Sequence, residues 1–91
     1  MSGSPAPDGE IEVEYVETAS ERMVVYRRGE REVAIAQNAT GYAMLTVREG
    51  AEGDELERYY GLDMALDHVA EVLGVHPGAL PLPDAAADMG I

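Results

Sequence analysis

The hydrophobic and polar positions in the first half of the chain alternate in short runs, which predicts a series of strands. Residues 10–15 alternate at every position, as a strand with one wet face and one buried face does. Residues 23–26 and 33–36 are β-branched, aromatic or small and apolar, and residues 42–48 alternate again. Because the connections are short, successive strands must be antiparallel. The pattern therefore predicts an antiparallel meander.

Turn residues separate these runs. Gly29-Glu30 is a two-residue connection with glycine first, which is typical of a type II′ hairpin. Residues 38–41 form the next predicted turn, because Asn and Gly tolerate positive φ. Residues 54–60 fit either a fifth strand after a glycine-rich turn or a short capped helix. We favour the strand.

Residues 62–73 are predicted to form one helix, because their apolar side chains recur at i, i+3, i+4 and i+7. Gly74 stands where a left-handed C-terminal cap belongs, and Pro77 prevents continuation. In the tail, Asp84 is predicted to cap a short helical turn over residues 85–89.

These elements predict an α+β fold: a four- or five-stranded antiparallel meander, covered on one face by a single helix, with a Pro-rich tail. Residues 1–9 are expected to be disordered, since they can bury little apolar surface. Residues 10–76 form the predicted sheet-plus-helix domain. Residues 77–91 are expected to pack on it, across the sheet edge or its second face.

Composition points to the solvent in which the protein works. Eighteen acidic residues face six basic ones, all arginine, and the net charge is −12. The carboxylates are spread along the whole chain instead of clustering. Dispersed carboxylate without lysine is typical of a surface that stays hydrated in concentrated salt. We therefore predict a halophilic protein.

The sequence also indicates a cellular compartment and narrows the classes of partner. It has no cysteine, no apolar run long enough to span a membrane and no signal-peptide pattern, so a cytoplasmic location is expected. The acidity argues against nucleic acid as a partner in dilute buffer. At molar salt the Debye length is about 3 Å, so this argument weakens there.

The alternation places apolar residues on both faces of the predicted sheet. One helix can cover only one face, to which we assign Ile11, Val13, Val25, Val33, Ile35, Leu45 and Val47. The second face is then rich in Tyr, Met and small residues, which suits a protein interface. We predict a homodimer interface there, formed by Val24, Tyr26, Ala34, Ala36, Tyr42 and Met44. The alternative is that residues 80–82 of the tail cover this face.

Four of the six arginines lie close together around the predicted hairpin. They are Arg22, Arg27, Arg28 and Arg31. They could bind an anion, such as a phosphate, a ligand carboxylate or a nucleic-acid backbone. They could equally pair with glutamates on neighbouring strands, and we favour this second interpretation.

No catalytic, cofactor or metal motif stands out. The helix carries Asp63, Asp67, His68 and Glu71, but the carboxylates at 67 and 71 lie opposite its apolar stripe, where nothing would complete a coordination shell. We interpret these residues as a solvated helix face. The sequence predicts no cofactor, no metal and no enzymatic activity.

Two stretches carry a resemblance to known proteins. Residues 41–47 (GYAMLTV) and 62–70 (LDMALDHVA) resemble the HicB-like antitoxin family, in which a short antiparallel sheet precedes a helix. As a whole the chain is similar to small acidic conserved-hypothetical proteins of haloarchaea. Neither resemblance transfers a functional residue. The leading hypothesis is a small non-catalytic interaction protein. The alternatives are a nucleic-acid- or toxin-binding regulator that uses the Arg22–Arg31 hairpin, and a small-ligand binder or enzyme subunit.

Overall fold

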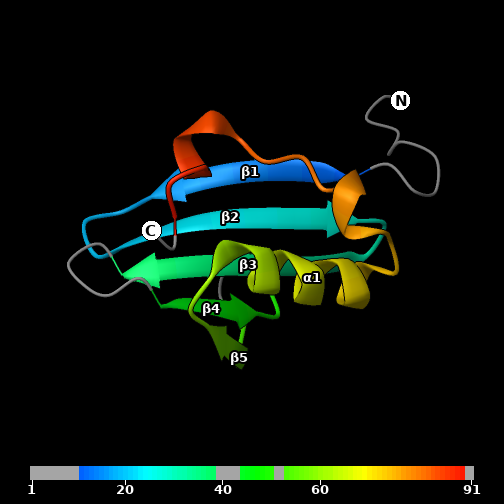
Figure 1. Ribbon diagram of the computed structural model, residues 1–91, viewed down its shortest axis with the longest axis horizontal. Helices are drawn as coiled ribbons and strands as arrows, with labels where there is room; N and C mark the ends of the chain where they lie inside the picture. The colour runs from blue at the N-terminus through cyan, green and yellow to red at the C-terminus, as the bar shows by residue number, and fades with distance from the viewer. Residues whose placement is uncertain (1–10, 39–43, 51–52, 90–91) are drawn as a thin grey trace.

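The computed structural model describes residues 11–38, 44–50 and 53–89. They form a five-stranded sheet, an α-helix and two short 3-10 helices (Figure 1). The strands are β1 (Glu12–Glu17), β2 (Glu21–Arg28), β3 (Arg31–Asn38), β4 (Leu45–Arg48) and β5 (Glu55–Tyr59). The helices are α1 (Leu62–Leu73), η1 (Pro77–Ala79) and η2 (Asp84–Ala86). Residues 1–9, whose disorder was predicted, lie outside the described part.

The sheet is an antiparallel meander in which each strand pairs with its neighbour in the sequence, in the order β1-β2-β3-β4-β5. The predicted fold class is confirmed. The alternative at residues 54–60 is decided in favour of a strand, β5, which pairs with β4 through a register shift at Val47/Arg48. The expected helix has the predicted bounds, Leu62–Leu73.

The connection between β2 and β3 is the two-residue hairpin that the sequence predicts. Gly29 has φ +62, and no described residue other than glycine has a positive φ. A type II′ turn requires this combination, with positive φ at its first central residue only. Arg28 and Arg31 are direct cross-strand partners on either side of the turn.

The face assignment made for β2 from the sequence is wrong. Val24 pairs with Ile35 and Tyr26 with Val33, and all four belong to the core beneath α1. Val25, expected in that core, pairs with Ala34 and therefore lies on the opposite face. Four consecutive apolar residues, 23–26, hide the alternation. The register imposed by the hairpin decides which face each one takes.

The core lies between one face of the sheet, α1 and the C-terminal tail. Its fully or almost fully buried members are Val24, Tyr26, Val33, Ile35, Leu45, Val47, Ala65, Val69, Leu73, Ala86 and Met89. After α1 the chain turns back at η1 and runs along β1 to η2 (Figure 1). The helix and the tail therefore lie side by side on the same face of the sheet.

The sequence analysis placed the tail across the sheet edge or the second face. This is wrong, because the tail covers the same side of the sheet as the helix. Ala86 and Met89 are 0 % and 1 % exposed and belong to the same core as the helix. A helix is about 10 Å wide, whereas five strands span about 19 Å. Because α1 packs mainly over β3, β4 and β5, the β1–β2 side needs a second cover. The cap of η2 is Pro83, and Asp84 stands in its first turn.

The C-terminal end of α1 is closed by glycine, as predicted. Gly74 has φ +74, and its N–H reaches the carbonyls of Ala70 and Glu71. The N–H of Val75 also donates to the carbonyl oxygen of Ala70, over 2.9 Å. This is the Schellman arrangement, in which a left-handed residue lets two N–H groups satisfy the last carbonyls of the helix.

Replacing Met89 with alanine tests whether the tail is part of the core. Removing a fully buried side chain of this size costs about 2–5 kcal/mol. We expect Met89→Ala to lower the free energy of unfolding by that amount in urea denaturation. Leu82→Ala is the matched control, because Leu82 is already 36 % exposed and should lose far less. Equal, small losses in both variants would show that the tail is not needed by the core.

Candidate functional site

Arg22 joins the tail to the sheet. Its Nη2 donates to Asp88 Oδ1 over 2.5 Å and to the carbonyl oxygen of Ala85 over 2.7 Å. Its Nε donates to the hydroxyl of Tyr15 over 2.9 Å. One guanidinium thus binds β1 and the segment around η2 at once. This fan of donors on a rigid plane is specific to arginine.

Arg27 lies on the opposite face of β2 and binds glutamates from both neighbouring strands. Its Nε donates to Glu32 Oε1 over 2.8 Å, and its Nη2 to Glu14 Oε1 over 3.3 Å. This is the cross-strand pairing that the sequence favoured. Such half-exposed pairs each contribute about 1 kcal/mol or less.

Arg28 and Arg31 bind the end of the helix. Arg28 Nη1 donates to the carbonyl oxygen of Leu73 over 2.7 Å, and Arg31 Nη1 to that of Val72 over 2.6 Å. These carbonyls belong to the last turn of α1, where no intrahelical donor is available and the helix dipole is negative. Both arginines therefore cap α1 from the hairpin.

The four arginines around the hairpin do not form one anion site. Arg27 points to one side of the sheet and the other three to the other side, because strand positions alternate. Arg22 and Arg27 hold carboxylates. Only Arg28 and Arg31 lie together, and they bind backbone carbonyls.

The predicted interface residues are also divided between the two faces. Val24 and Tyr26 are 0 % exposed in the core under α1 and the tail, so they cannot form a surface. Burial raises the pKa of Tyr26 to about 12. Ala34 and Ala36 lie on the second face but are 0 % and 2 % exposed, so they lie beneath its surface. Met44, which is half-buried, remains as a candidate there. Tyr42 lies outside the described residues.

The second face of the sheet has a floor of small and apolar side chains beneath a layer of ion pairs. Met23, Val25, Ala34 and Ala36 form the floor, and all are less than 8 % exposed. Arg48 extends from β4 to Glu21 on β2, with Nη2–Oε1 2.9 Å and Nη1–Oε2 3.2 Å. The bidentate pair spans β3, where alanines leave room for it. In the described part of the chain, α1 and the tail both pack on the other face.

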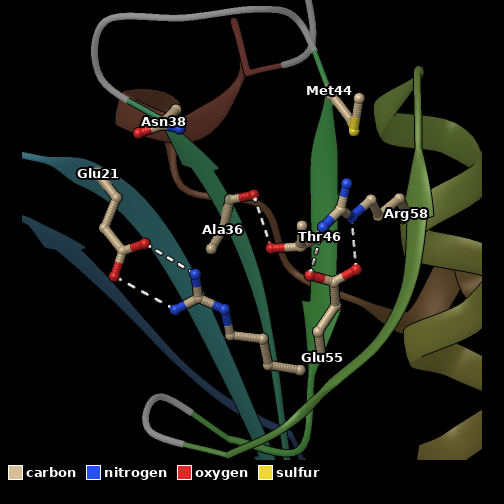
Figure 2. Close-up of a pocket in the computed structure, with 8 residues that line it drawn as sticks. Glu21, Ala36, Asn38, Met44, Thr46, Glu55 and Arg58 are labelled. Atoms are coloured by element: carbon tan, nitrogen blue, oxygen red, sulfur yellow. Dashed lines mark hydrogen bonds and ion pairs between the residues drawn. The ribbon is translucent and has the colours of Figure 1, made fainter.

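A hollow of about 540 Å³ opens on the second face (Figure 2). Its lining residues are Glu21, Ala36, Asn38, Met44, Thr46, Arg48, Glu55 and Arg58. Figure 2 shows Glu21 on one side and Glu55 with Arg58 on the other, with Ala36 and Thr46 between them. Arg58 Nε donates to Glu55 Oε2 over 2.5 Å. Thr46 Oγ1 donates to the carbonyl oxygen of Ala36 over 3.4 Å.

The chemistry available in the hollow is polar recognition. Two guanidinium groups and two carboxylates lie around an apolar floor, so the charges are balanced locally. The Glu21–Arg48 and Glu55–Arg58 pairs were missed in the sequence, because the first depends on register across three strands. One sequence signal for the Glu21–Arg48 pair is the spacing of Ala34 and Ala36. Two small side chains on the same face of β3 leave space in which side chains from β2 and β4 can meet.

The acidic helix face holds no metal-like arrangement in the described residues, where no three potential ligands cluster. His68 turns toward the sheet, and its Nδ1 lies 3.0 Å from the hydroxyl of Tyr59. Their rings meet edge to face, with centroids 5.7 Å apart. This contact joins α1 to β5. No helix in the described part is both long enough and apolar enough to cross a membrane.

Fold and site together define a two-layer α+β protein, with a helix and tail on one side of an antiparallel sheet and an ion-paired hollow on the other. The chain belongs to the family of unknown function DUF7111, whose model matches residues 5–91. Comparisons with curated proteins and with solved structures found no match.

The Arg22–Asp88 contact predicts a pH effect on the tail. The pKa of Asp88 is lowered, chiefly because its carboxylate accepts a hydrogen bond from Arg22. Because the pKa of Asp88 is lower in the folded state, the contact stabilises the protein at any pH above the ordinary pKa of Asp. This contribution to the free energy of unfolding disappears as the pH falls through the lowered pKa. NMR titration should therefore show Asp88 ionising below its usual range.

Arg22→Gln should return the pKa of Asp88 to its ordinary range, because the charged donor is lost. Arg58→Gln is the matched control, since Arg58 binds Glu55 and not the tail. If Asp88 titrates normally in the unmodified protein, the tail is not held by this contact.

Proposed function

We propose that this protein is a non-catalytic interaction protein of a salt-rich cytoplasm, and that it assembles as a homodimer through the second face of its sheet. The observation that carries the proposal is the character of that face. It spans the sheet and has an apolar floor, and each of its three arginines, Arg27, Arg48 and Arg58, binds a glutamate.

The distribution of arginine supports a role in concentrated salt. Each of the six arginines has a hydrogen-bond partner within the protein. The basic side chains are thus used for internal contacts. Eighteen carboxylates face only six arginines, so most carboxylates have no arginine to pair with. An acidic shell of this kind keeps a protein hydrated and soluble where salt screens charge repulsion.

Charge complementarity favours a second copy as the partner on the second face. Arg27, Arg48 and Arg58 lie there among glutamates, so both signs alternate across one surface. A surface with both signs can be complementary to itself across a two-fold axis. A polyanion would need free cations, and it would first have to break these pairs.

The small floor residues support close approach by a flat partner surface. Ala34 and Ala36 add little height above the backbone, and Met44 borders the hollow with an adaptable thioether side chain. We assign Met44 to the interface, and the two buried alanines to the layer directly beneath it. Interfaces are also enriched in Arg and Met relative to the remaining surface.

The engaged carboxylates support a non-catalytic role. Glu21 and Glu55 are the acidic residues of the hollow, and each accepts hydrogen bonds from an arginine. The oxygens of both carboxylates are engaged by a guanidinium, so a substrate would have to displace that contact before it could reach them. A small-ligand binder or enzyme subunit would have to use this same hollow.

The regulator remains the second candidate, supported by the resemblance of residues 41–47 and 62–70 to HicB-like antitoxins. Its contact surface was expected at the Arg22–Arg31 hairpin. Arg28 and Arg31 hold the helix end, and Arg22 and Arg27 hold carboxylates, so this surface offers little free positive charge. We therefore place it behind the homodimer.

Salt should stabilise the fold over a wide range. The Debye length falls from about 30 Å at 0.01 M to about 3 Å at 1 M, so repulsion among the carboxylates weakens steadily. We expect the midpoint of thermal unfolding to rise from low to molar potassium chloride at fixed protein concentration. Potassium gluconate should act in the same direction. An unchanged midpoint would argue against adaptation to salt.

Met44→Glu tests the homodimer, with Met64→Glu as the matched control. Met44 borders the hollow, whereas Met64 is 57 % exposed on α1. An unpaired carboxylate that loses its water costs several kcal/mol, so Met44→Glu should weaken the dimer by about a hundredfold or more. Sedimentation in molar potassium chloride measures this directly.

The unmodified protein and Met64→Glu should both sediment as dimers, with circular dichroism confirming that every variant is folded. A monomeric unmodified protein would overturn the proposal. Dimers that respond to Met64→Glu and not to Met44→Glu would place the interface on the helix side instead.

A further inference from the structure

The side chains of the second face lie in rows that run across the sheet. Each row is set by the cross-strand pairing, and neighbouring rows are two residues, or about 7 Å, apart along the strands. The first row is Glu12, Arg27 and Glu32, the second is Glu14, Val25, Ala34, Arg48 and Glu55, the third is Val16, Met23, Ala36, Thr46 and Arg58, and the fourth is Glu21 and Asn38. Every charge on this face therefore has a defined position both along and across the strands.

Glu55 and Arg58 share the second face although they are three residues apart on β5. In a regular strand, residues with this spacing point to opposite faces. The register shift at Val47/Arg48 removes the difference, so that Glu55 lies opposite Arg48 and Arg58 lies opposite Thr46. The two side chains are 39 % and 62 % exposed and border the hollow together (Figure 2). β5 thus presents one charge of each sign in neighbouring rows.

A two-fold axis midway between the second and third rows, parallel to them, would bring opposite charges together. It lays each strand on its own copy in the partner, running the opposite way. The second row then faces the partner's third row, and the first row faces the partner's fourth. Arg58 lies opposite the partner's Glu55, and Arg27 lies opposite the partner's Glu21. By symmetry each of these contacts occurs twice.

Other placements of the axis bring like charges together. An axis along the second row would set Glu55 against the partner's Glu55, and an axis along the third row would set Arg58 against the partner's Arg58. An axis parallel to the strands, along β3, would set Glu14 against the partner's Glu55. Because like charges that face each other across an interface are strongly unfavourable, the axis midway between the two rows is preferred.

Arg58 also has a donor to spare for a partner. Its Nε and Nη2 both bind the carboxylate of Glu55, and in the described part of the chain its Nη1 makes no hydrogen bond. A carboxylate oxygen accepts more than one hydrogen bond, so Glu55 can bind a second guanidinium as well. Facing sheets pack about 10 Å apart, a gap that long side chains fill from both sides.

We propose that the two copies pack face to face about the axis midway between the second and third rows. Arg58 and Glu55 then form a closed ring of alternating charges with the partner's Glu55 and the partner's Arg58. This inference rests on the homodimer proposed above, and adds the direction in which the two sheets meet and the side chains that fix it.

Reversing the charge on either side of the ring tests this arrangement. Arg58→Glu leaves only carboxylates around the axis, and Glu55→Arg leaves only guanidinium groups. Each variant alone should therefore dimerise about a hundredfold or more weakly in sedimentation in molar potassium chloride, because charges inside an interface are screened little by salt. An equimolar mixture of the two variants should recover the dimer, since every contact across the axis then joins a carboxylate to a guanidinium.

Two further chains complete the test. A chain that carries both Arg58→Glu and Glu55→Arg restores every contact and should dimerise like the unmodified protein. Glu71→Arg is the matched control, because Glu71 is exposed on α1 and its replacement changes the charge as much as Glu55→Arg does. It should also dimerise like the unmodified protein. Circular dichroism verifies that each chain is folded.

The outcomes separate the alignment of the two sheets from the existence of the dimer. If both reversed variants dimerise as strongly as the unmodified protein, or if their mixture or the doubly reversed chain does not recover the dimer, the proposed alignment is overturned. The homodimer would still stand in these cases, because the unmodified protein and Met44→Glu report it separately. A monomeric unmodified protein would overturn both.

Discussion

The two-residue hairpin at Gly29-Glu30 is the constraint on which most of this structure depends. By pairing Arg28 with Arg31 it fixes the register of β2 against β3. That register sends Tyr26 into the core and Val25 to the opposite face. It also places two arginines beside the end of α1 and leaves the alanines of β3 on the second face. The core, the helix cap and the hollow thus follow from one tight turn.

Local patterns in the sequence predict the elements well. The alternating runs, the turn residues and the helical spacing of residues 62–73 each depend on a few neighbouring positions. Gly74 is an equally local signal, because only a left-handed residue closes the helix in this way. The meander follows from short connections, which leave no room for a crossover. These parts of the fold needed no knowledge of distant contacts.

The parts that sequence reasoning missed all depend on register or on distant contacts. The run of four apolar residues in β2 has no visible alternation, so its faces had to be taken from the predicted hairpin. The pattern within β2 alone does not show which of its residues face the helix. Arg22 meets Asp88 across 66 positions of the sequence, and Arg48 meets Glu21 across 27. Neither spacing has a local signature in the sequence. For the same reason, the predicted interface residues and the four arginines around the hairpin are divided between the two faces of the sheet.

The use of arginine in place of lysine also has a structural reason, besides its relation to the solvent. Arg22 reaches three partners, and Arg48 grips one carboxylate with two nitrogens across a strand. An ammonium group on a flexible stem cannot reproduce this planar, multiple contact. Arginines on the second face bind carboxylates, whereas Arg28 and Arg31 bind the backbone carbonyls at the end of α1. One residue type therefore performs two different tasks in the fold, ion pairing across strands and capping of a helix, and the partner of each guanidinium decides which.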